Sequence, residues 1–490
     1  MDSGRHERHH FVLVHGLCHG AWCWYKVATA LEAAGHRVTA LDLAASGAHP
    51  ARLHEVRSFE DYSRPLLDAV AAAPDGDRLV LVGHSFGGHN LALAMERFPR
   101  KVAVAVFISA PMPVPGRPMS TVLEQHLEGD STPDSFLDST FGVMERGLEN
   151  PAETFLLGPE WMSQRMYQLS PAEDLTLAKT LVRPAQMFLG DEAMAGENVL
   201  TWDRYGAVSR VFVVTEEDRT WPAEEQLEAA ASCGPGVESR DETTMETESG
   251  KQQHHFVLVH GICHGAWCWY KVATLLSSAG HRVTALDMAA CGASPGRAEE
   301  VPSFEDYSRP LLAVVSGLPP DEKAVLVGHS FGGLSLALAM ERYPDRVAVA
   351  VFVAAGMPAA GKPMTSVFEQ LSQEEQPADR YMDCEFVTSG DPQHPVETIR
   401  FGPQYLKQRL YQLSPPEDLT LAMAMVRPSR WFLHDATMNE DVLTAERYGA
   451  VRRVCVVAED DVSSLSAGFQ RRMASLNPGT EVRAEGVAGS

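Results

Sequence analysis

Cysteine is scarce in this chain, which has 8 among its 490 residues. Thiols this few do not make a disulfide framework and are typical of a reduced compartment, so a cytoplasmic location is expected. Several belong to a short pattern that occurs twice, as His15, Cys18, His19 and Cys23 and as His260, Cys263, His264 and Cys268. Because this pattern lacks the second ligand pair of a structural zinc site, we expect no metal there.

Basic residues are also few, since 41 Lys and Arg stand against 65 Asp and Glu and give a formal net charge of −24. Nucleic acids and anionic membranes select cationic proteins, so neither is an expected partner. No apolar run reaches the roughly 20 residues of a transmembrane helix. The polar start lacks the apolar stretch of a secretory signal. The composition, 45% hydrophobic and 22% charged, is that of a soluble globular protein.

What the chain has instead is a repeat that covers almost all of it. The segment Leu79-Val-Leu-Val-Gly-His-Ser-Phe-Gly-Gly88 returns nearly unchanged at residues 324–333, half of the chain further on. A period of this length is far above that of solenoid repeats and predicts two whole domains. We place them at residues 1–237 and 254–490, joined by a polar linker at 238–253 that has no hydrophobic period.

The repeated segment contains Gly-x-Ser-x-Gly between an apolar β-branched run and a helix-forming stretch. In that context the glycines let the chain turn sharply from strand to helix, and the serine hydroxyl is exposed above the helix N-terminus. A single motif of this kind is a weak signal. Here the flanking patterns and the repetition agree, so Ser85 and Ser330 are the predicted nucleophiles of two nucleophile elbows.

Strands and helices alternate through the first part of each copy. In the first copy we predict strands at 10–14, 37–41, 78–82 and 102–108 and helices at 24–34, 59–73 and 86–98. Such alternation predicts an α/β fold whose mostly parallel sheet has helices on both faces. It stops at residues 112–184, and in the second copy at about 357–428, where we expect a helical cap. The sheet of the first copy resumes at 210–214.

The loop after the first strand supplies a second part of the expected site. With this kind of elbow, the oxyanion hole takes one backbone N–H from that loop and one from the residue after the nucleophile. We therefore expect the amides of Leu17 and Phe86 to act in the first copy, and those of Ile262 and Phe331 in the second. A glycine-containing turn without such a role has the same composition.

The shared motifs V-H-G-x-C-H-G-A-W-x-W, G-H-x-V-T-A-L-D-x-A-A-x-G, L-V-G-H-S-x-G-G, Y-Q-L-S-P-x-E-D-L-x-L-A and V-R-P carry a family resemblance. The chain resembles the plant methylesterase and hydroxynitrile lyase family of α/β-hydrolases, including methylesterases of the salicylic acid-binding protein 2 type. The resemblance spans Phe11 to about Val237 and Phe256 to about Val482. It implies hydrolysis of methyl esters of jasmonate, salicylate or indole-acetate by a Ser-Asp-His triad without a cofactor. It leaves homodimer formation open.

The resemblance also assigns further site residues. It places the triad acid after the late strand of each copy, where we choose Asp218 and Asp461. An acid at the end of a strand can orient an imidazole and stabilise its cation, although acidic turns without function are common there. The resemblance further places Phe136 and Tyr381 on the cap wall of an apolar pocket for the small ester or acid, where ordinary core packing is the alternative.

The triad histidine is the departure from the family pattern. Similar proteins carry it after one more strand, in a Gly-x-Asp-His-Met-like loop that precedes the last helix. Neither residues 234–242 nor residues 478–490 contain a histidine. We therefore expect each domain to lack its last strand and helix together with the base. Three further pairs of histidines do not suit a base: His84 and His329 lie in the elbow, His15 and His260 flank the oxyanion loop, and His254 and His255 lie at the N-terminal edge of a strand.

The parallel losses have two explanations. The first is that two neighbouring genes were joined, each without its last coding segment. The second is a fused pseudoenzyme that binds an ester or acid without turning it over. Loss of a triad member typically leaves only about 10³ to 10⁴-fold catalysis from the oxyanion hole and binding.

Three functions compete. The leading one is a tandem serine carboxylesterase of the methylesterase type. Hydroxynitrile lyases of the family carry Thr where this chain has Gly16 and Gly261, and Glu in place of His84 and His329, so both positions favour the esterase. The absent histidine favours the third function, a non-catalytic small-ligand protein. Apolar pockets discriminate by only about 1 to 3 kcal/mol per methylene, so the acyl group stays undecided.

Overall fold

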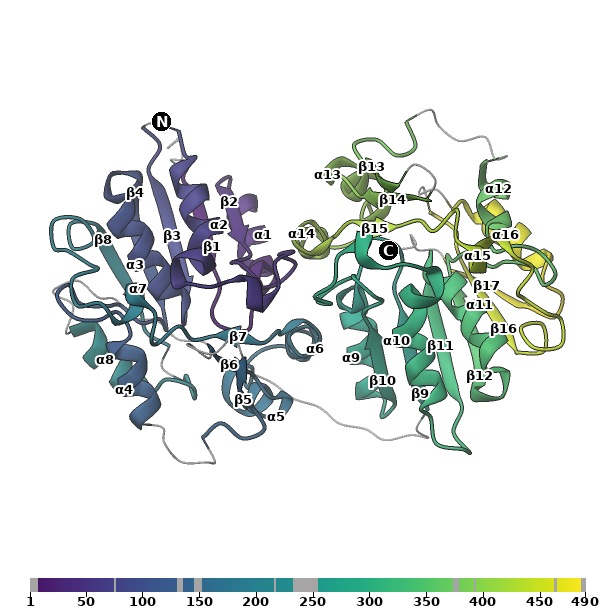
Figure 1. Ribbon diagram of the computed structural model, residues 1–490, viewed down its shortest axis with the longest axis horizontal. Coiled ribbons are helices and arrows are strands. Elements are labelled where there is room, and N and C mark those ends of the chain that lie inside the picture. Colours follow the sequence, from purple (N-terminus) through teal and green to yellow (C-terminus); the bar gives the residue numbers. More distant parts are fainter. Residues whose placement is uncertain are drawn as a thin grey trace, which may run out of the picture. The chain divides into compact units, whose positions relative to one another are not determined.

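The chain divides into two compact units, Met1–Glu246 and Thr247–Ser490. The computed structural model describes residues 8–74, 76–129, 135–144, 152–215, 217–231, 254–372, 379–391, 394–461 and 465–485. The predicted linker at 238–253 lies outside the described residues. Each unit contains a parallel sheet flanked by helices (Figure 1), which confirms the predicted α/β architecture.

The sheet of the first domain forms from largely apolar segments that are rich in β-branched residues. Its strands are β1 (His10–Val14), β2 (Arg37–Leu41), β3 (Leu79–His84), β4 (Val102–Ile108) and β8 (Ser209–Val213). They lie in the order β2-β1-β3-β4-β8, and every neighbouring pair is parallel. Parallel neighbours require crossover connections, which helices supply here.

Helices cover both faces of this sheet. The helix α1 (Tyr25–Ala33) lies on one face, and α2 (Phe59–Ala71) and α3 (Gly87–Arg97) lie on the other. Leu13 packs toward Trp24 on the α1 face, whereas Val12 and Val14 belong to the core on the opposite face. Because successive strand residues point to opposite faces, both sides of β1 are covered, and its sequence is apolar from Phe11 to Val14.

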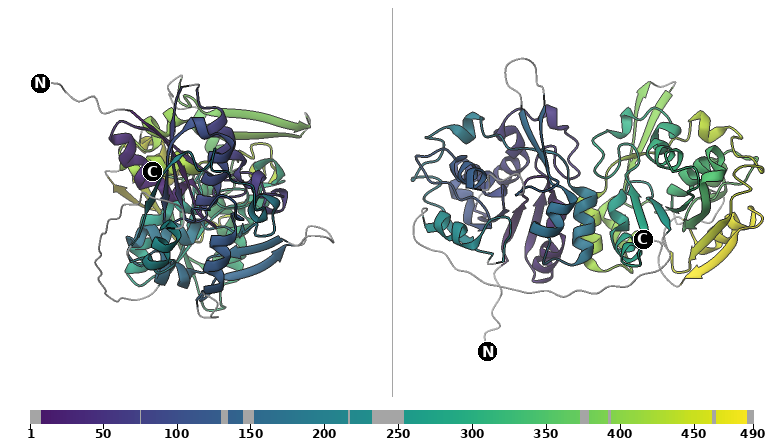
Figure 2. Two further views of the ribbon diagram at one scale, coloured as in Figure 1. Left: turned by 90° about the vertical axis from the view of Figure 1, so that its left-hand side faces the viewer. Right: turned by 90° about the horizontal axis from the view of Figure 1, so that it is seen from below.

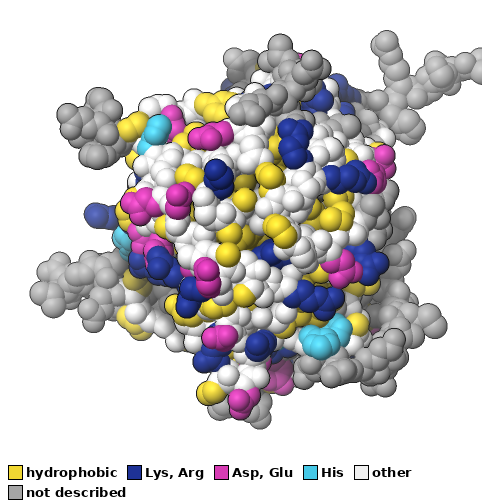
Figure 3. Space-filling model, turned by 90° about the vertical axis from the view of Figure 1, so that its right-hand side faces the viewer, with side chains coloured by type: hydrophobic (Ala, Val, Ile, Leu, Met, Phe, Trp, Pro, Cys, Tyr) yellow, Lys and Arg dark blue, Asp and Glu magenta, His cyan; other side chains and the backbone are white. Residues whose placement is uncertain are grey.

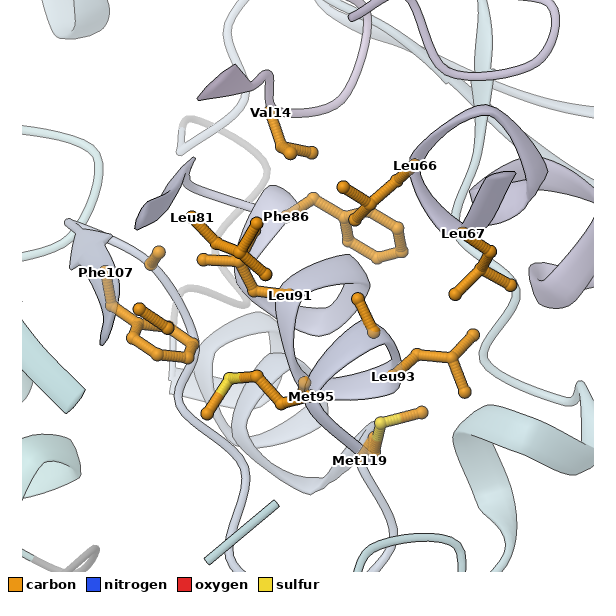
Figure 4. Close-up of a cluster of buried hydrophobic side chains, with 14 of the residues drawn as sticks. Val14, Leu66, Leu67, Leu81, Phe86, Leu91, Leu93, Met95, Phe107 and Met119 are labelled. Atoms are coloured by element: carbon orange, nitrogen blue, oxygen red, sulfur yellow. The ribbon is translucent and has the colours of Figure 1, made fainter. Parts of the chain in front are cut away.

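The larger core of the first domain lies beneath the nucleophile elbow. Its central side chains come from β1, β3, β4, α2, α3 and the start of the cap (Figure 4). Val14, Leu81, Leu91, Phe107 and Met119 are all 0% exposed. This packing supports the start of α3, which directly follows the elbow serine.

The cap of the first domain is not wholly helical, which corrects the prediction. Its elements are α4 (Thr121–Gly129), β5 (Thr140–Met144), β6 (Ala152–Leu156), α5 (Pro159–Trp161), the π-helical turn η4 (Met162–Met166), α6 (Ala172–Leu181), β7 (Ala185–Gln186) and α7 (Glu192–Ala195). The three strands form an antiparallel sheet. Aromatic and β-branched residues such as Phe141, Val143 and Phe155 favour extended backbone here. The chain then returns to β8, and α8 (Ala223–Ala231) follows it.

The second domain repeats this architecture. Its main sheet and helices are β9 (His255–Val259), α9 (Tyr270–Ser278), β10 (Arg282–Leu286), α10 (Phe304–Ser316), β11 (Ala324–His329), α11 (Gly332–Arg342), β12 (Val347–Val353), β16 (Arg453–Ala458), α16 (Ala467–Ser475) and β17 (Glu481–Glu485). The strand order is β10-β9-β11-β12-β16-β17.

The cap of the second domain is likewise mixed. It contains α12 (Ser366–Ser372), β13 (Glu385–Asp391), β14 (His394–Arg400), α13 (Pro403–Tyr405), the π-helical turn η8 (Leu406–Leu410), α14 (Pro416–Met425), β15 (Ser429–Arg430) and α15 (Ala436–Asn439). The antiparallel hairpin of β13 and β14 projects from its domain (Figure 2). This again corrects the expectation of a helical cap.

The strand β17 corrects the expectation that both domains end one strand early. It pairs in parallel with β16, from Val454 opposite Glu481 to Ala458 opposite Glu485. The prediction missed it because Glu481-Val-Arg-Ala-Glu is short and mostly charged, which is typical of an edge strand. The residues that match it in the first domain, 238–242, lie outside the described residues.

The surface carries charges of both signs. On the face shown in Figure 3, acidic and basic side chains are interspersed with smaller hydrophobic areas. In the described part of the chain, no helix combines the length and the apolar character needed to cross a membrane.

Leu91→Ala should lower the free energy of unfolding of the first domain by about 2–5 kcal/mol, because it leaves a cavity in a core that does not collapse fully. Val143→Ala, at a position 66% exposed, should change it by less than about 0.5 kcal/mol. Scanning calorimetry of the full chain checks this, since only the transition of the first domain should shift. A Leu91→Ala thermogram that matches the wild type would contradict the packing in Figure 4.

Candidate functional site

Both predicted nucleophiles occupy a strained turn between a strand and a helix. Ser85 joins β3 to α3 with a φ of 51°, and Ser330 joins β11 to α11 with a φ of 52°. A non-glycine residue in this region costs on the order of 1–3 kcal/mol and persists only where its surroundings enforce it. The Ser85 N–H donates to Ile108 O at 3.3 Å, and Ser85 O accepts from Gly88 N–H at 2.9 Å. The turn is therefore held by hydrogen bonds on both sides.

Close backbone contacts explain the glycines after the serine. A β-carbon on Gly87 would lie 2.8 Å from Val14 O, and one on Gly88 would lie 2.2 Å from Pro111 O. A side chain on Gly87 would push the start of α3 away from β1, and one on Gly88 would push it away from the segment that follows β4. The motif therefore encodes the close approach of a helix N-terminus to a strand.

Gly16 and Gly261 face the two nucleophiles. A β-carbon on Gly16 would lie 2.9 Å from Ser85 Cβ, and one on Gly261 would lie 3.0 Å from Ser330 Cβ. The threonine expected of a lyase would therefore crowd both serines, and at Gly16 it would force a shift in its surroundings.

The predicted oxyanion residues meet the nucleophiles at two cavities. The first cavity is lined by Leu17, Ser85 and Phe86, and the second by Ile262, Ser330 and Phe331. Within the described part of the chain, none of the four predicted oxyanion residues, Leu17, Phe86, Ile262 and Phe331, donates its backbone N–H to a hydrogen bond. Uncommitted amides beside a nucleophile are the groups that can stabilise an oxyanion. Their assignment as oxyanion donors stays a prediction.

His15 fixes the direction of one of these amides. Its Nδ1 is 2.7 Å from Gly16 O, and Leu43 N–H donates to its Nε2 at 3.1 Å. A carbonyl only accepts and an N–H only donates, so the imidazole is neutral with its proton on Nδ1. The Gly16 carbonyl and the Leu17 N–H belong to one trans peptide and point in opposite directions. The bond to Gly16 O therefore turns the Leu17 amide away from His15.

Asp218 lies in the loop after β8, and donors already cover its carboxylate. It accepts from the hydroxyls of Ser109, Thr215 at 3.1 Å and Thr220 at 2.6 Å, from the N–H groups of Thr220 at 2.7 Å and Trp221 at 3.2 Å, and from Gln226 Nε2 at 3.4 Å. Ser109 and Thr220 also line the cavity of Ser85. Where a triad acid would hold an imidazole, hydroxyl and amide groups take both oxygens.

Asp461 holds the equivalent place in the second domain and lines the cavity of Ser330. Gln470 Nε2 donates to its Oδ2 at 3.4 Å. Ala354 stands where the first domain has Ser109, so the second domain has one hydroxyl fewer at this point.

Two histidines, His264 and His329, also line the second cavity. His264 uses both ring nitrogens, because its Nδ1 is 3.0 Å from Ile262 O and its Nε2 is 2.9 Å from Tyr411 OH. It therefore fixes the oxyanion loop and has no nitrogen left for a serine proton.

Apolar cap residues close both cavities. The first has a volume of about 120 Å³ and includes Phe136, Trp161 and Met187 among its walls. The second has a volume of about 80 Å³ and includes Tyr381 and Trp431. Phe136 and Tyr381 line these cavities, and their contact with a substrate stays a prediction. Sequence reasoning did not find Trp161, Met187 or Trp431.

Contacts between cap and sheet account for several of the shared motifs. In the first domain, Tyr167 OH is 2.8 Å from His19 Nε2, Asp174 accepts from Tyr25 OH at 2.6 Å and Lys26 Nζ at 2.7 Å, and Arg183 Nη1 donates to Gly47 O at 2.8 Å. The second domain repeats them with Tyr411, Asp418 and Arg427. The Y-Q-L-S-P-x-E-D-L and V-R-P motifs therefore fasten the cap.

The repeated His/Cys pattern also serves packing. The Cys18 thiol is buried and donates to Phe155 O at 3.3 Å. Burial raises the pKa of this thiol far above its usual range. Among the residues that the structure describes, no group of three or more His, Cys, Asp or Glu side chains could hold a metal ion.

Comparison with known proteins identifies the family of this chain. The model of the alpha/beta hydrolase family matches residues 11–245 and 256–488. The chain belongs to the alpha/beta hydrolase family. It is 52% identical over 248 residues to Esterase PIR7B of Oryza sativa subsp. japonica, which covers 50% of this chain and 91% of that protein.

Two further relatives are similar in extent. Methyl jasmonate esterase 1 of Vitis vinifera is 47% identical over 233 residues, covering 48% of this chain and 88% of that protein. Salicylic acid-binding protein 2 of Nicotiana tabacum is 46% identical over 221 residues, covering 45% of this chain and 84% of that protein. These proteins confirm the predicted resemblance to plant methylesterases, and each corresponds to about half of this chain.

The free energy of unfolding should fall as the pH drops from about 6.5 to about 4. Burial lowers the pKa of His15, His89, His260 and His264 to about 4, whereas an unfolded chain keeps a pKa near ~6.5. The unfolded state binds more protons in this window, so stability is fully present above pH ~6.5 and is lost toward the folded pKa.

His89→Gln should flatten this dependence by up to ~1.4 kcal/mol per pH unit, and His54→Gln, at an exposed position, should leave it unchanged. Urea unfolding at several pH values measures the slope. An identical slope for His89→Gln and the wild type would contradict a buried neutral imidazole.

Proposed function

We propose that the protein is a carboxylesterase that hydrolyses methyl esters of small plant-hormone acids, with methyl jasmonate, methyl salicylate and methyl indole-acetate as candidate substrates. The observation that carries this proposal is the strained serine turn that borders an apolar cavity beside uncommitted backbone amides. The esterase relatives support the reaction class.

The proposed chemistry assigns one role to each predicted residue. The serine Oγ attacks the ester carbonyl, the amides of Leu17 and Phe86 stabilise the oxyanion, and methanol leaves before water releases the acid. Ile262 and Phe331 serve Ser330 in the same way. Phe136 and Tyr381 contact the acyl group from the cap. The step that needs most help is removal of the serine proton, since a hydroxyl is a weak nucleophile without a base.

The surroundings of Asp218 favour slow turnover in the first domain. Its oxygens accept from Ser109, Thr215, Thr220 and Gln226, and these groups cannot take a proton at neutral pH. The same observation supports a second candidate function, which is binding of the ester or acid without hydrolysis.

The wild-type chain should hydrolyse methyl jasmonate or methyl salicylate at less than about 1 s⁻¹, below the usual enzyme range. Millimolar imidazole should raise the rate because it supplies a diffusible base, and the variant with both Ser85→Ala and Ser330→Ala should not respond. Methanol release measures the reaction, and the melting temperature of the double variant controls for folding.

Two results would redirect the proposal. Turnover well above ~1 s⁻¹ that needs the serines would show that a base is already present. Tight binding of the acids by calorimetry, with no hydrolysis even in imidazole, would favour the binding function over the esterase.

A further inference from the structure

The cavity of Ser85 contains a histidine that the proposed mechanism does not use. His126, on the cap helix α4, lines this cavity together with Ser85. Its Nδ1 is 3.7 Å from Glu225 Oε2, at the start of α8, and its side chain is 25% exposed. Its ring lies 6.2 Å from that of Trp221, another wall residue. A carboxylate and an imidazole thus meet at the edge of an otherwise mostly apolar cavity.

The second domain has apolar residues at both matching positions. Val122 and Val367 line equivalent walls of the two cavities, so Leu371 is the counterpart of His126 in the second domain. Gln226 and Gln470 donate equivalent hydrogen bonds to Asp218 and Asp461. Phe469 is therefore the counterpart of Glu225 in the second domain. Leu371 is 6% exposed and lines the second cavity, and Phe469 is 0% exposed. The pair therefore belongs to the first domain.

Other wall changes remove a hydroxyl from the second cavity and narrow it. Ala354 replaces Ser109, and the larger side chains Phe368 and Trp431 replace Leu123 and Met187. Polar groups in a mostly apolar pocket fix the orientation of a ligand and supply its specificity. A site that hydrogen-bonds a ligand group also rejects analogues without it more strongly than an apolar wall rejects a changed methylene.

The chemistry of His126 indicates which ligand group fits. Because Nδ1 faces a carboxylate, Nε2 is the nitrogen left for a ligand. A hydroxyl can donate to Nε2 of the neutral ring and can also accept from the protonated ring. When the neutral ring has its proton on Nδ1, toward Glu225, Nε2 only accepts, so a ketone or ester oxygen then fits the protonated ring only. A hydroxyl bonds to either form.

We infer that the two domains have different specificities, and that the first selects acyl groups that bear a hydroxyl, with His126 as its hydrogen-bond partner. The second domain accepts acyl groups of smaller volume without such a substituent. This inference rests on the proposed function, since it assumes that both cavities take small methyl esters.

Calorimetry on the full chain tests the inference with methyl phenylacetate and its three ring-hydroxylated isomers. All samples carry Leu410→Trp, which fills the second cavity, so that the first cavity is measured. His126→Leu installs the residue of the second domain, and His126→Gln keeps a hydrogen-bonding group. With His126, at least one hydroxylated isomer should bind about tenfold more tightly than methyl phenylacetate, as one net hydrogen bond implies.

In His126→Leu this preference should disappear while the affinity for methyl phenylacetate changes by less than about twofold. His126→Gln should keep part of it. A preference of the same size in His126→Leu, or none with His126, would overturn the inference and leave the proposed function standing. If none of the four esters binds to the chain with His126, the inference fails together with the proposed ester binding by the first cavity, whereas hydrolysis of methyl jasmonate or methyl salicylate by the wild-type chain tests the proposed function separately. Melting curves of the variants verify that each is folded.

Discussion

The start of α3 lies directly on the backbone of β1, and the geometry of each site depends on this contact. It exists because Gly87 has no side chain to separate the helix from Val14 O. The contact forces the preceding serine into the left-handed region and leaves the next amide without a hydrogen-bond partner among the described residues. In the second domain, a β-carbon on Gly332 would lie 2.8 Å from Val259 O, so the same constraint acts there.

The sheet and the elbow could be predicted because their signals are local. The strands β1, β2 and β4 begin and end where the sequence predicts, since each is a short, mostly apolar run between turns or helices. The cap strands gave no comparable signal. Phe141 and Val143 of β5 are 53% and 66% exposed. Their apolar side chains are therefore not the sign of a buried strand that they are in the main sheet. The edge strand β17 was missed for the opposite reason, because it is largely charged.

The cavity walls could not be derived from sequence, because they combine residues that lie far apart along the chain. Trp161 comes from a three-residue helix, Met187 follows the two-residue strand β7, and His126 lies on α4. No periodicity connects such positions. The shared motifs predicted the family, but their physical task emerged only from the contacts. Asp42, for example, accepts from Ala21 N–H at 2.7 Å and Ala48 N–H at 2.9 Å, and so joins two loops.

The fastening of the cap governs how a ligand enters and leaves. Asp174 and Arg183 connect the cap to the sheet domain through charge-assisted hydrogen bonds, and Arg183 is only 8% exposed. To lift the cap would leave that buried guanidinium unsatisfied, which is costly. Ligand exchange that keeps the cap in place avoids this cost. A cap that is already fastened also spares the ligand the entropy of ordering a loose lid.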